Sequence, residues 1–96
     1  MPNELIESNL RLLSGAFLKL HSEEEIKLFL KDLLSNSEQK SITERFKIAL
    51  MLESGMHYSQ IERETGVSSA TIAKVSENLK YGNDGYKLII GRLHKK

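Results

Sequence analysis

Gly66, a glycine between two helix-like segments, is the feature that most restricts what this chain can fold into. It lies five residues after Ile61 and six before Ile72, and Val67 follows it directly. Two helices that turn through roughly a right angle within about three or four residues need a residue able to adopt positive φ, which is usually glycine. Val67 can then plug the angle between the helices. The spacing predicts a helix-turn-helix over 58–80.

Helical spacing of apolar residues continues through the rest of the chain, so the predicted fold class is all-α, with six helices. Proline occurs only at position 2, and no alternating run rich in Val, Ile and Thr indicates a strand. Ser22 with Glu25, and Ser35 with Glu38, have the spacing of capping boxes. They are expected to start the second and third helices.

Each predicted helix has one apolar face that should be buried. In the first helix this face is a long stripe, which needs a partner. The third helix should end at Gly55 and the fifth at Gly82. The last helix, capped by the sequence GND, should bury some combination of its four apolar residues given below. The side chains expected on the buried faces are Ile6, Leu10, Leu13, Phe17 and Leu20; Ile26, Phe29, Leu30, Leu33 and Leu34; Ile42, Phe46, Ala49 and Leu50; Ile61; Ile72, Val75 and Leu79; and Tyr86, Ile89, Ile90 and Leu93.

The chain has 96 residues, a size at which much of a monomer's surface stays exposed and oligomerisation is a natural remedy. Together with the long first stripe, this predicts a homodimer. We expect one domain over 1–96, with dimerisation helices in 1–54, the helix-turn-helix in 58–80 and a C-terminal helix in 84–93.

Composition argues against several classes of site. The chain has no cysteine, which excludes disulfides and thiolate metal sites, and its three histidines are far apart. No stretch approaches the roughly 20 apolar residues of a membrane span, and the start lacks a targeting pattern. We therefore expect a cytoplasmic protein with no catalytic residue, metal or cofactor, and an enzyme is the weakest interpretation.

Basic charge is concentrated toward the end of the chain. Residues 1–48 hold seven Lys or Arg against eight Asp or Glu, whereas residues 67–96 hold six against two. A basic end of the chain could bind a polyanion, although a run of charged residues is more often only a solvated surface. Lys80 is a candidate phosphate contact there.

Small, polar and basic residues form the outer face of the second helix of the motif. Ser68 can cap this helix by accepting from the backbone N–H of Ala70 or Thr71, leaving the N-terminus open to a phosphate. Small side chains let a helix enter the major groove, where Thr or Ala can contact a thymine methyl group. The pattern favours double-stranded DNA as the partner, with a purely structural corner as the alternative. The outward residues are Ser69, Ala70, Thr71, Ala73 and Lys74.

Residues 34–86, LSNSEQKSITERFKIALMLESGMHYSQIERETGVSSATIAKVSENLKYGNDGY, resemble the Trp repressor family, in particular its YerC/YecD branch. The stretches IERETGVSSATIAKV and YGNDGY match that branch well, whereas the first two helices agree only in length and pattern. The resemblance implies an all-helical homodimer with interlocked N-terminal helices. Each subunit would present one helix-turn-helix to an operator half-site, as a bacterial, nucleoid-associated repressor does.

By position, the resemblance also implies roles for single residues. It places Gln60, Ser68, Ser69, Ala70, Thr71 and Lys74 toward DNA, and Arg45, Lys74 and Asn78 around an effector pocket. Arg45 equally suits a surface ion pair.

Tryptophan is not the expected effector. The resemblance implies a comparison with the tryptophan site of that family. The tryptophan repressor holds the indole ring of its ligand between two arginines, and it needs a glycine and a serine nearby. Arg45 keeps one arginine, but Lys74, Val75 and Asn78 stand at the other three positions. Lysine cannot stack on an indole as a planar guanidinium does, and the branched valine would fill the space that glycine leaves for the ring.

A second interpretation stays open beside the repressor. The chain could be an interaction module that uses the same fold to bind DNA or protein without regulating a promoter. A specific operator would separate the two.

Overall fold

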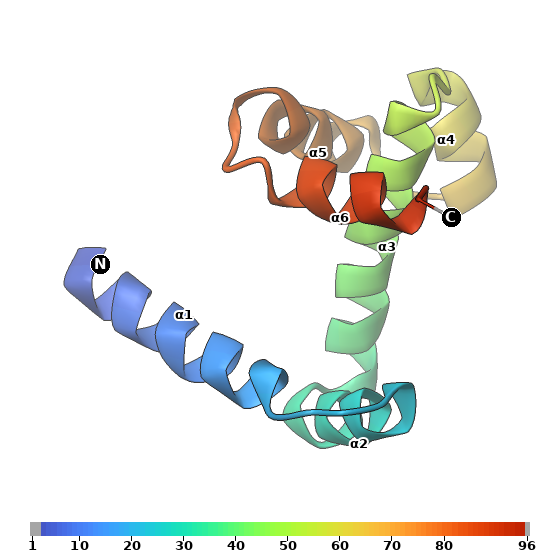
Figure 1. The fold of residues 1–96 in the computed structure, drawn as a ribbon. Helices are drawn as coiled ribbons and strands as arrows, with labels where there is room; N and C mark the ends of the chain where they lie inside the picture. Colours follow the sequence, from blue (N-terminus) through green and yellow to red (C-terminus); the bar gives the residue numbers. More distant parts are fainter. Residues whose placement is uncertain (1–2, 96) are drawn as a thin grey trace. The chain divides into compact units, whose positions relative to one another are not determined.

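The structure of the chain, a computed structural model, describes residues 3–95. These residues form six α-helices and no strand, which confirms the predicted all-α class (Figure 1). The helices are α1 (Asn3–Leu18), α2 (Glu23–Leu33), α3 (Asn36–Glu53), α4 (Tyr58–Thr65), α5 (Ser69–Tyr81) and α6 (Gly85–Leu93).

The chain divides into two compact units, residues 1–39 and residues 40–96. In the first unit, neither α1 nor α2 has a buried residue. The rings of Phe17 and Phe29 meet edge to face, with centroids 5.3 Å apart, yet Leu10 is 53% exposed and Leu13 40%. Leu20, expected on the stripe of the first helix, lies beyond its end at Leu18. The unit thus covers the apolar stripe of α1 only in part.

Both predicted serine caps are present, but only Ser35 with Glu38 forms a complete capping box, because Glu25 reaches back to His21 and not to Ser22. Ser22 Oγ accepts from the backbone N–H of Glu25 at 3.1 Å, and Ser35 Oγ from that of Glu38 at 3.2 Å. Glu38 Oε1 in turn accepts from the Ser35 N–H at 2.9 Å, while Glu25 Oε1 accepts from the His21 N–H at 2.7 Å. The backbone and side-chain hydrogen bonds from Ser35 hold the pKa of Glu38 below its ordinary value, because they favour the charged carboxylate. The helix starts are therefore set by local hydrogen bonds.

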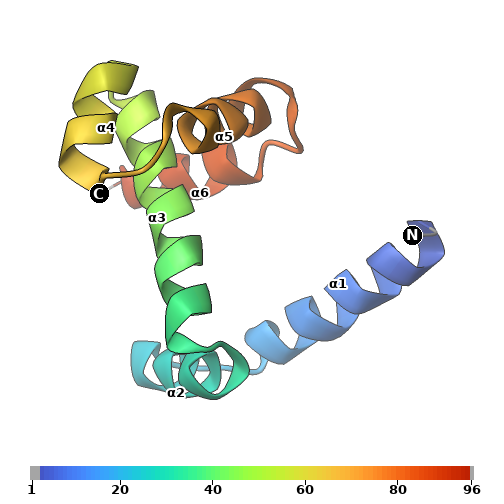
Figure 2. The same cartoon turned by 180° about the vertical axis from the view of Figure 1, so that it is seen from behind.

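The second unit has a core to which four helices contribute. In the two views, α4, α5 and α6 lie around the C-terminal part of α3 (Figures 1 and 2). Because α3 has neighbours on more than one side here, it buries more than the single face that periodicity predicts. The buried apolar residues are Ile48, Ala49, Ile61, Ile72, Val75, Leu79 and Ile90.

Two expectations for α3 are wrong. Ile48, which was not expected inside, is fully buried, whereas Ile42, which was, is 52% exposed. Ile48 is in the part of α3 that packs into the core, with Ala49 beside it and Leu52 one turn further on. Ile42 precedes that part, so the burial of each residue depends on where neighbouring helices reach α3.

The last helix has one buried residue. Ile90 is in the core and Tyr86 packs against it, while Ile89 and Leu93 are exposed. Asp84 is the N-cap residue, but it adopts a left-handed conformation with φ of 63° and its side chain makes no capping hydrogen bond. The helix start predicted at GND is confirmed, without a side-chain cap from Asp84. Gly82 ends α5 as predicted, and a Cβ at this position would collide with the carbonyl oxygen of Asn78.

Candidate nucleic-acid interface

The corner between α4 and α5 turns at Gly66, as predicted. Gly66 is left-handed, with φ of 72°, and its N–H donates to the Glu62 carbonyl at 2.8 Å. Thr65 Oγ1 donates to the Ile61 carbonyl at 2.7 Å and accepts from the Val67 N–H at 3.1 Å. Val67 is half-buried and packs against the core. Helix α4 therefore ends in a left-handed glycine cap, which the hydrogen bonds of Thr65 Oγ1 reinforce. Val67 packs against the core beside this cap, as predicted.

Helix α5 starts with the predicted serine cap. Ser68 Oγ accepts from the Thr71 N–H at 3.3 Å and lies 3.2 Å from Thr71 Oγ1. The N–H groups of Ser69 and Ala70, in the first turn, have no intrahelical acceptor because of helix geometry alone. With the positive end of the helix dipole, they make this terminus favourable for a phosphate oxygen.

The residues predicted to face outward are accessible on α5. Ser69, Ala70, Ala73 and Lys74 are exposed, and Thr71 is half-buried. Lys74 Nζ is 4.0 Å from Glu77 Oε2, and both side chains are mostly exposed. Such a surface ion pair contributes little, so the lysine can exchange it for another anion. Ser68 is also exposed, and Gln60, on α4, is half-buried.

The three residues expected around an effector pocket come together. Arg45, Lys74 and Asn78 line one hollow of about 280 Å³, here called the Arg45 hollow, together with Ala70, Thr71 and Val75. Val75 is only 2% exposed, in keeping with its predicted inward position. Arg45 forms no ion pair with any of residues 3–95. The alternative of a surface ion pair therefore finds no support within these residues.

Lys80 is not beside this group. At about 100° per residue, Lys80 is about 120° round α5 from Lys74. It lines a different hollow, with Ser76 and Lys87 among its neighbours. The DNA-facing set predicted from sequence is thus divided between two sides of the helix.

Metal and membrane features are not found in the part of the chain that the structure describes. There, no three His, Cys, Asp or Glu side chains are grouped so that they could hold a metal ion. No helix within residues 3–95 combines the length and the apolar character needed to cross a bilayer.

Comparison with known proteins identifies the family. The family model for Trp repressor protein matches residues 8–94. The chain belongs to the Trp repressor family. The match includes α2 and most of α1, which resembled the family only in length and pattern.

A similar protein and two solved structures accompany this assignment. The chain is 41% identical over 81 residues to the uncharacterized protein YerC of Bacillus subtilis (strain 168), covering 84% of this chain and 78% of that protein. The crystal structure of a TrpR-like protein from Eubacterium eligens superimposes with a TM-score of 0.86 at 37% identity, covering 96% of this chain and 95% of the other. A solved structure from Staphylococcus aureus gives 0.84 at 37% identity, covering 93% and 89%. The Trp-repressor-like fold and the YerC-like branch are thereby confirmed.

One polar residue of this Trp-repressor-like fold was not anticipated. Ser76 is only 7% exposed and is the one buried polar residue among those described. It is one position after Val75 and four after Ile72, so the helical period already put it near the inward face. Its small hydroxyl gave no chemical signal in a stretch with several exposed serines.

Proposed function

We propose that this chain is a sequence-specific DNA-binding transcriptional regulator, a repressor, that acts as a homodimer through a helix-turn-helix formed by α4 and α5. The observation that carries the proposal is the corner at Gly66, which supports a capped α5 with a small, polar and basic outer face. Membership of the Trp repressor family supports the same assignment.

In this proposal α5 enters the major groove from its N-terminal end. Ser69, Ala70 and Thr71 lie closest to base edges, where a small residue avoids collision and a methyl group can meet a thymine methyl. Ser68 and the first-turn N–H groups bind phosphate, as does Lys74, and Gln60 and Lys80 contact the backbone on either side. Phosphate contacts position the helix, while the base contacts select the sequence.

The homodimer is supported by the partly exposed apolar stripe of the N-terminal unit. Ile6, Leu10, Leu13 and Phe17 are all exposed in the single chain. A soluble monomer seldom exposes a large contiguous apolar patch, whereas an interface between copies buries one. In this proposal residues 1–54 carry dimerisation, 58–80 bind DNA and 84–93 form the C-terminal helix of one domain.

Two substitutions in α5 test the DNA interface. Thr71→Ala should lower discrimination between the preferred site and random DNA by about tenfold, because a lost base contact typically costs about 1–3 kcal/mol. Lys74→Ala should weaken binding to all sequences and reduce the salt dependence by about one unit of slope, the signature of one phosphate contact. Fluorescence anisotropy over a salt series measures both effects.

The matched control is Lys47→Ala, which removes an exposed lysine from α3. It should leave affinity and salt slope near the wild-type values. If Thr71→Ala and Lys74→Ala have the same affinity and salt slope as this control, on the preferred site and on random DNA, α5 is not the recognition helix. Footprinting of the wild-type dimer should protect two half-sites about one helical turn apart.

The runner-up function is a DNA- or protein-interaction module that regulates no promoter. A genome-wide map of bound DNA separates the two. Peaks at promoters with a two-fold symmetric consensus support the regulator and its dimer, whereas scattered binding without a consensus supports the module.

Free tryptophan should not be the effector. Lys74 replaces a planar guanidinium in the Arg45 hollow, and the buried Val75 occupies volume that the family's tryptophan site leaves open. A ligand at about 100 times its Kd would stabilise the fold by about 2.7 kcal/mol, an effect that thermal melting resolves. We expect no rise in Tm with millimolar L-tryptophan.

A matched variant, Lys74→Arg with Val75→Gly, brings the hollow closer to the family's tryptophan site. If tryptophan stabilises this variant but not the wild type, these two positions account for the failure of the wild type to bind tryptophan. A clear rise in the wild-type Tm, paired with tighter operator binding, would contradict the prediction.

A further inference from the structure

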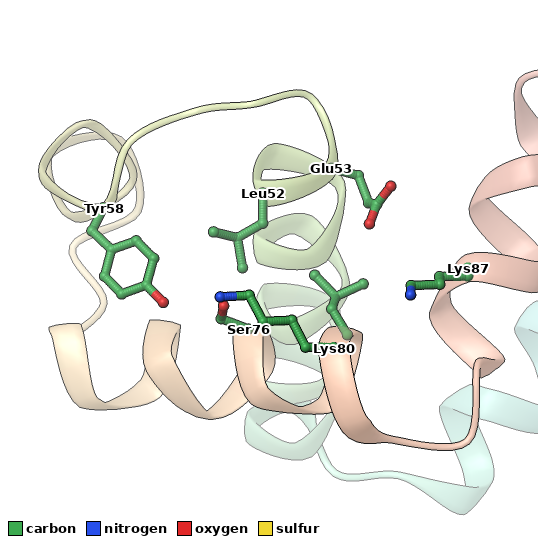
Figure 3. A pocket seen from close by; sticks show the side chains of 7 residues that line it. Leu52, Glu53, Tyr58, Ser76, Lys80 and Lys87 are labelled. Carbon is green, nitrogen blue, oxygen red and sulfur yellow. The ribbon is translucent and has the colours of Figure 1, made fainter.

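A second hollow in the C-terminal unit is lined by residues from four helices. It measures about 310 Å³, and we call it the Ser76 hollow. At about 100° per residue, its α5 residues lie on the side of that helix away from the Arg45 hollow. The lining residues are Leu52 and Glu53 of α3, Tyr58 of α4, Ser76, Leu79 and Lys80 of α5, and Lys87 of α6 (Figure 3).

The hydroxyl of Ser76 lines the hollow and has no hydrogen-bond partner among residues 3–95. The residue as a whole is 7% exposed. Among the described residues, every side-chain polar atom that is shut off from solvent has a hydrogen-bond partner. The Ser76 oxygen has none, so it must be accessible to solvent. The hydroxyl is therefore free to donate to an acceptor that enters the hollow.

Two ammonium groups border the same space. Lys80 comes from the last turn of α5 and Lys87 from α6, and neither forms an ion pair with any of residues 3–95. Figure 3 shows the Tyr58 hydroxyl and the Lys80 amine directed toward Ser76, with Lys87 pointing into the hollow from α6. All four groups can donate hydrogen bonds, and two of them are cationic.

Glu53 limits the charge that the hollow can accept. Its carboxylate is the one acidic group on the lining, against the two lysines. The lining therefore has a single excess positive charge, which a singly charged oxyanion would neutralise. Leu52 and Leu79 add an apolar wall, as small-molecule sites generally have beside a few polar groups.

We propose that the Ser76 hollow binds a small oxyanion between the ammonium groups of Lys80 and Lys87, with the Ser76 hydroxyl donating to it. The oxyanion is a carboxylate or phosphate group, either of a free small molecule or of the DNA backbone. Bound there, it links α5 to α6. If the oxyanion belongs to a free small molecule, this proposal does not depend on the proposed DNA-binding function.

The test titrates the full chain with acetate and with inorganic phosphate against chloride at constant ionic strength. Backbone amide NMR shifts at Ser76, Lys80 and Lys87 report binding. We expect saturable shifts that Lys80→Gln with Lys87→Gln abolishes. Ser76→Ala should weaken binding by about tenfold, the effect expected for one hydrogen bond to a charged group. Glu53→Gln should strengthen it, since it removes the opposing charge.

The control is Lys47→Gln with Lys95→Gln, which removes the same charge from exposed lysines outside the hollow. This variant should change the affinity by no more than about twofold, as exposed charges act weakly at a distance. If both double variants weaken anion binding equally, or if Glu53→Gln has no effect on it, binding is nonspecific and the proposal fails.

A second arm identifies the source of the oxyanion. If neither free anion binds, the Lys80→Gln, Lys87→Gln variant should weaken DNA binding more than the control and lower the salt slope by about two units. That result assigns the hollow to a DNA phosphate. The proposal is overturned if neither free anion binds and the double variant binds DNA as tightly as the control does. A chain that binds anions but no DNA would refute the proposed function while supporting this site.

Discussion

Replacing Ile72 with alanine should lower the free energy of unfolding by about 2–5 kcal/mol, the typical cost of truncating a buried isoleucine. Ile72 is 0% exposed and belongs to the core shared by α3, α4, α5 and α6. Truncation leaves a cavity where the two helices of the corner cross. Because domains are commonly stable by only about 5–15 kcal/mol, the loss would be a large part of the total.

Urea denaturation followed by circular dichroism measures this loss. The protomer concentration must be held constant, since dimerisation would contribute to the apparent stability. Ile72→Val is the graded control and should cost only about 0.5–1.5 kcal/mol. Ile61→Ala, at an equally buried position on α4, should resemble Ile72→Ala. Equal stability of the Ile72→Ala and Ile72→Val proteins would show that the core does not hold the corner.

Introducing aspartate at both Leu13 and Phe17 should abolish the proposed homodimer. These side chains belong to the apolar stripe of α1, with 40% and 37% of their surface still exposed in the single chain. Burying one large apolar side chain contributes roughly 1.5–3 kcal/mol, and an unpaired carboxylate in an apolar interface adds a desolvation cost. The variant should therefore be an unstable monomer or unfolded.

Light scattering coupled to size-exclusion chromatography measures the mass. The wild type should have twice the chain mass of 10.9 kDa at micromolar concentration. Leu13→Met is the matched control, since it keeps side-chain volume and apolar character and should remain dimeric. A stable wild-type monomer under these conditions would refute the interlocked arrangement.

The burial of α3 illustrates where periodicity fails. A search for one apolar face selected Ala49, which is buried, and Ile42, which is half exposed. It missed Ile48, because a helix that is surrounded buries residues outside a single stripe. How many sides of a helix are covered depends on segments far away in the sequence, so local spacing does not contain it.

The candidate site was predicted unevenly for a similar reason. The outward residues of α5 followed from helical spacing after Gly66, and the group of Arg45, Lys74 and Asn78 followed from the family resemblance. Lys80 was placed with the DNA-facing residues by charge alone, but the structure puts it on another side of α5, beside Ser76. Charge along a sequence gives no angle around a helix.

The sequence alone determined where α2, α3 and α5 start and where the corner turns. Ser22, Ser35 and Ser68 cap helices through hydrogen bonds to residues three positions on, and Gly66 supplies the one left-handed conformation that the corner needs. These features depend on atoms within about one helical turn, so their signals are local. The tertiary structure alone decided that Ile48 is buried and that Ser76 shares a hollow with Lys87. Those contacts join helices separated by many residues, and their energy depends on packing that no local pattern encodes.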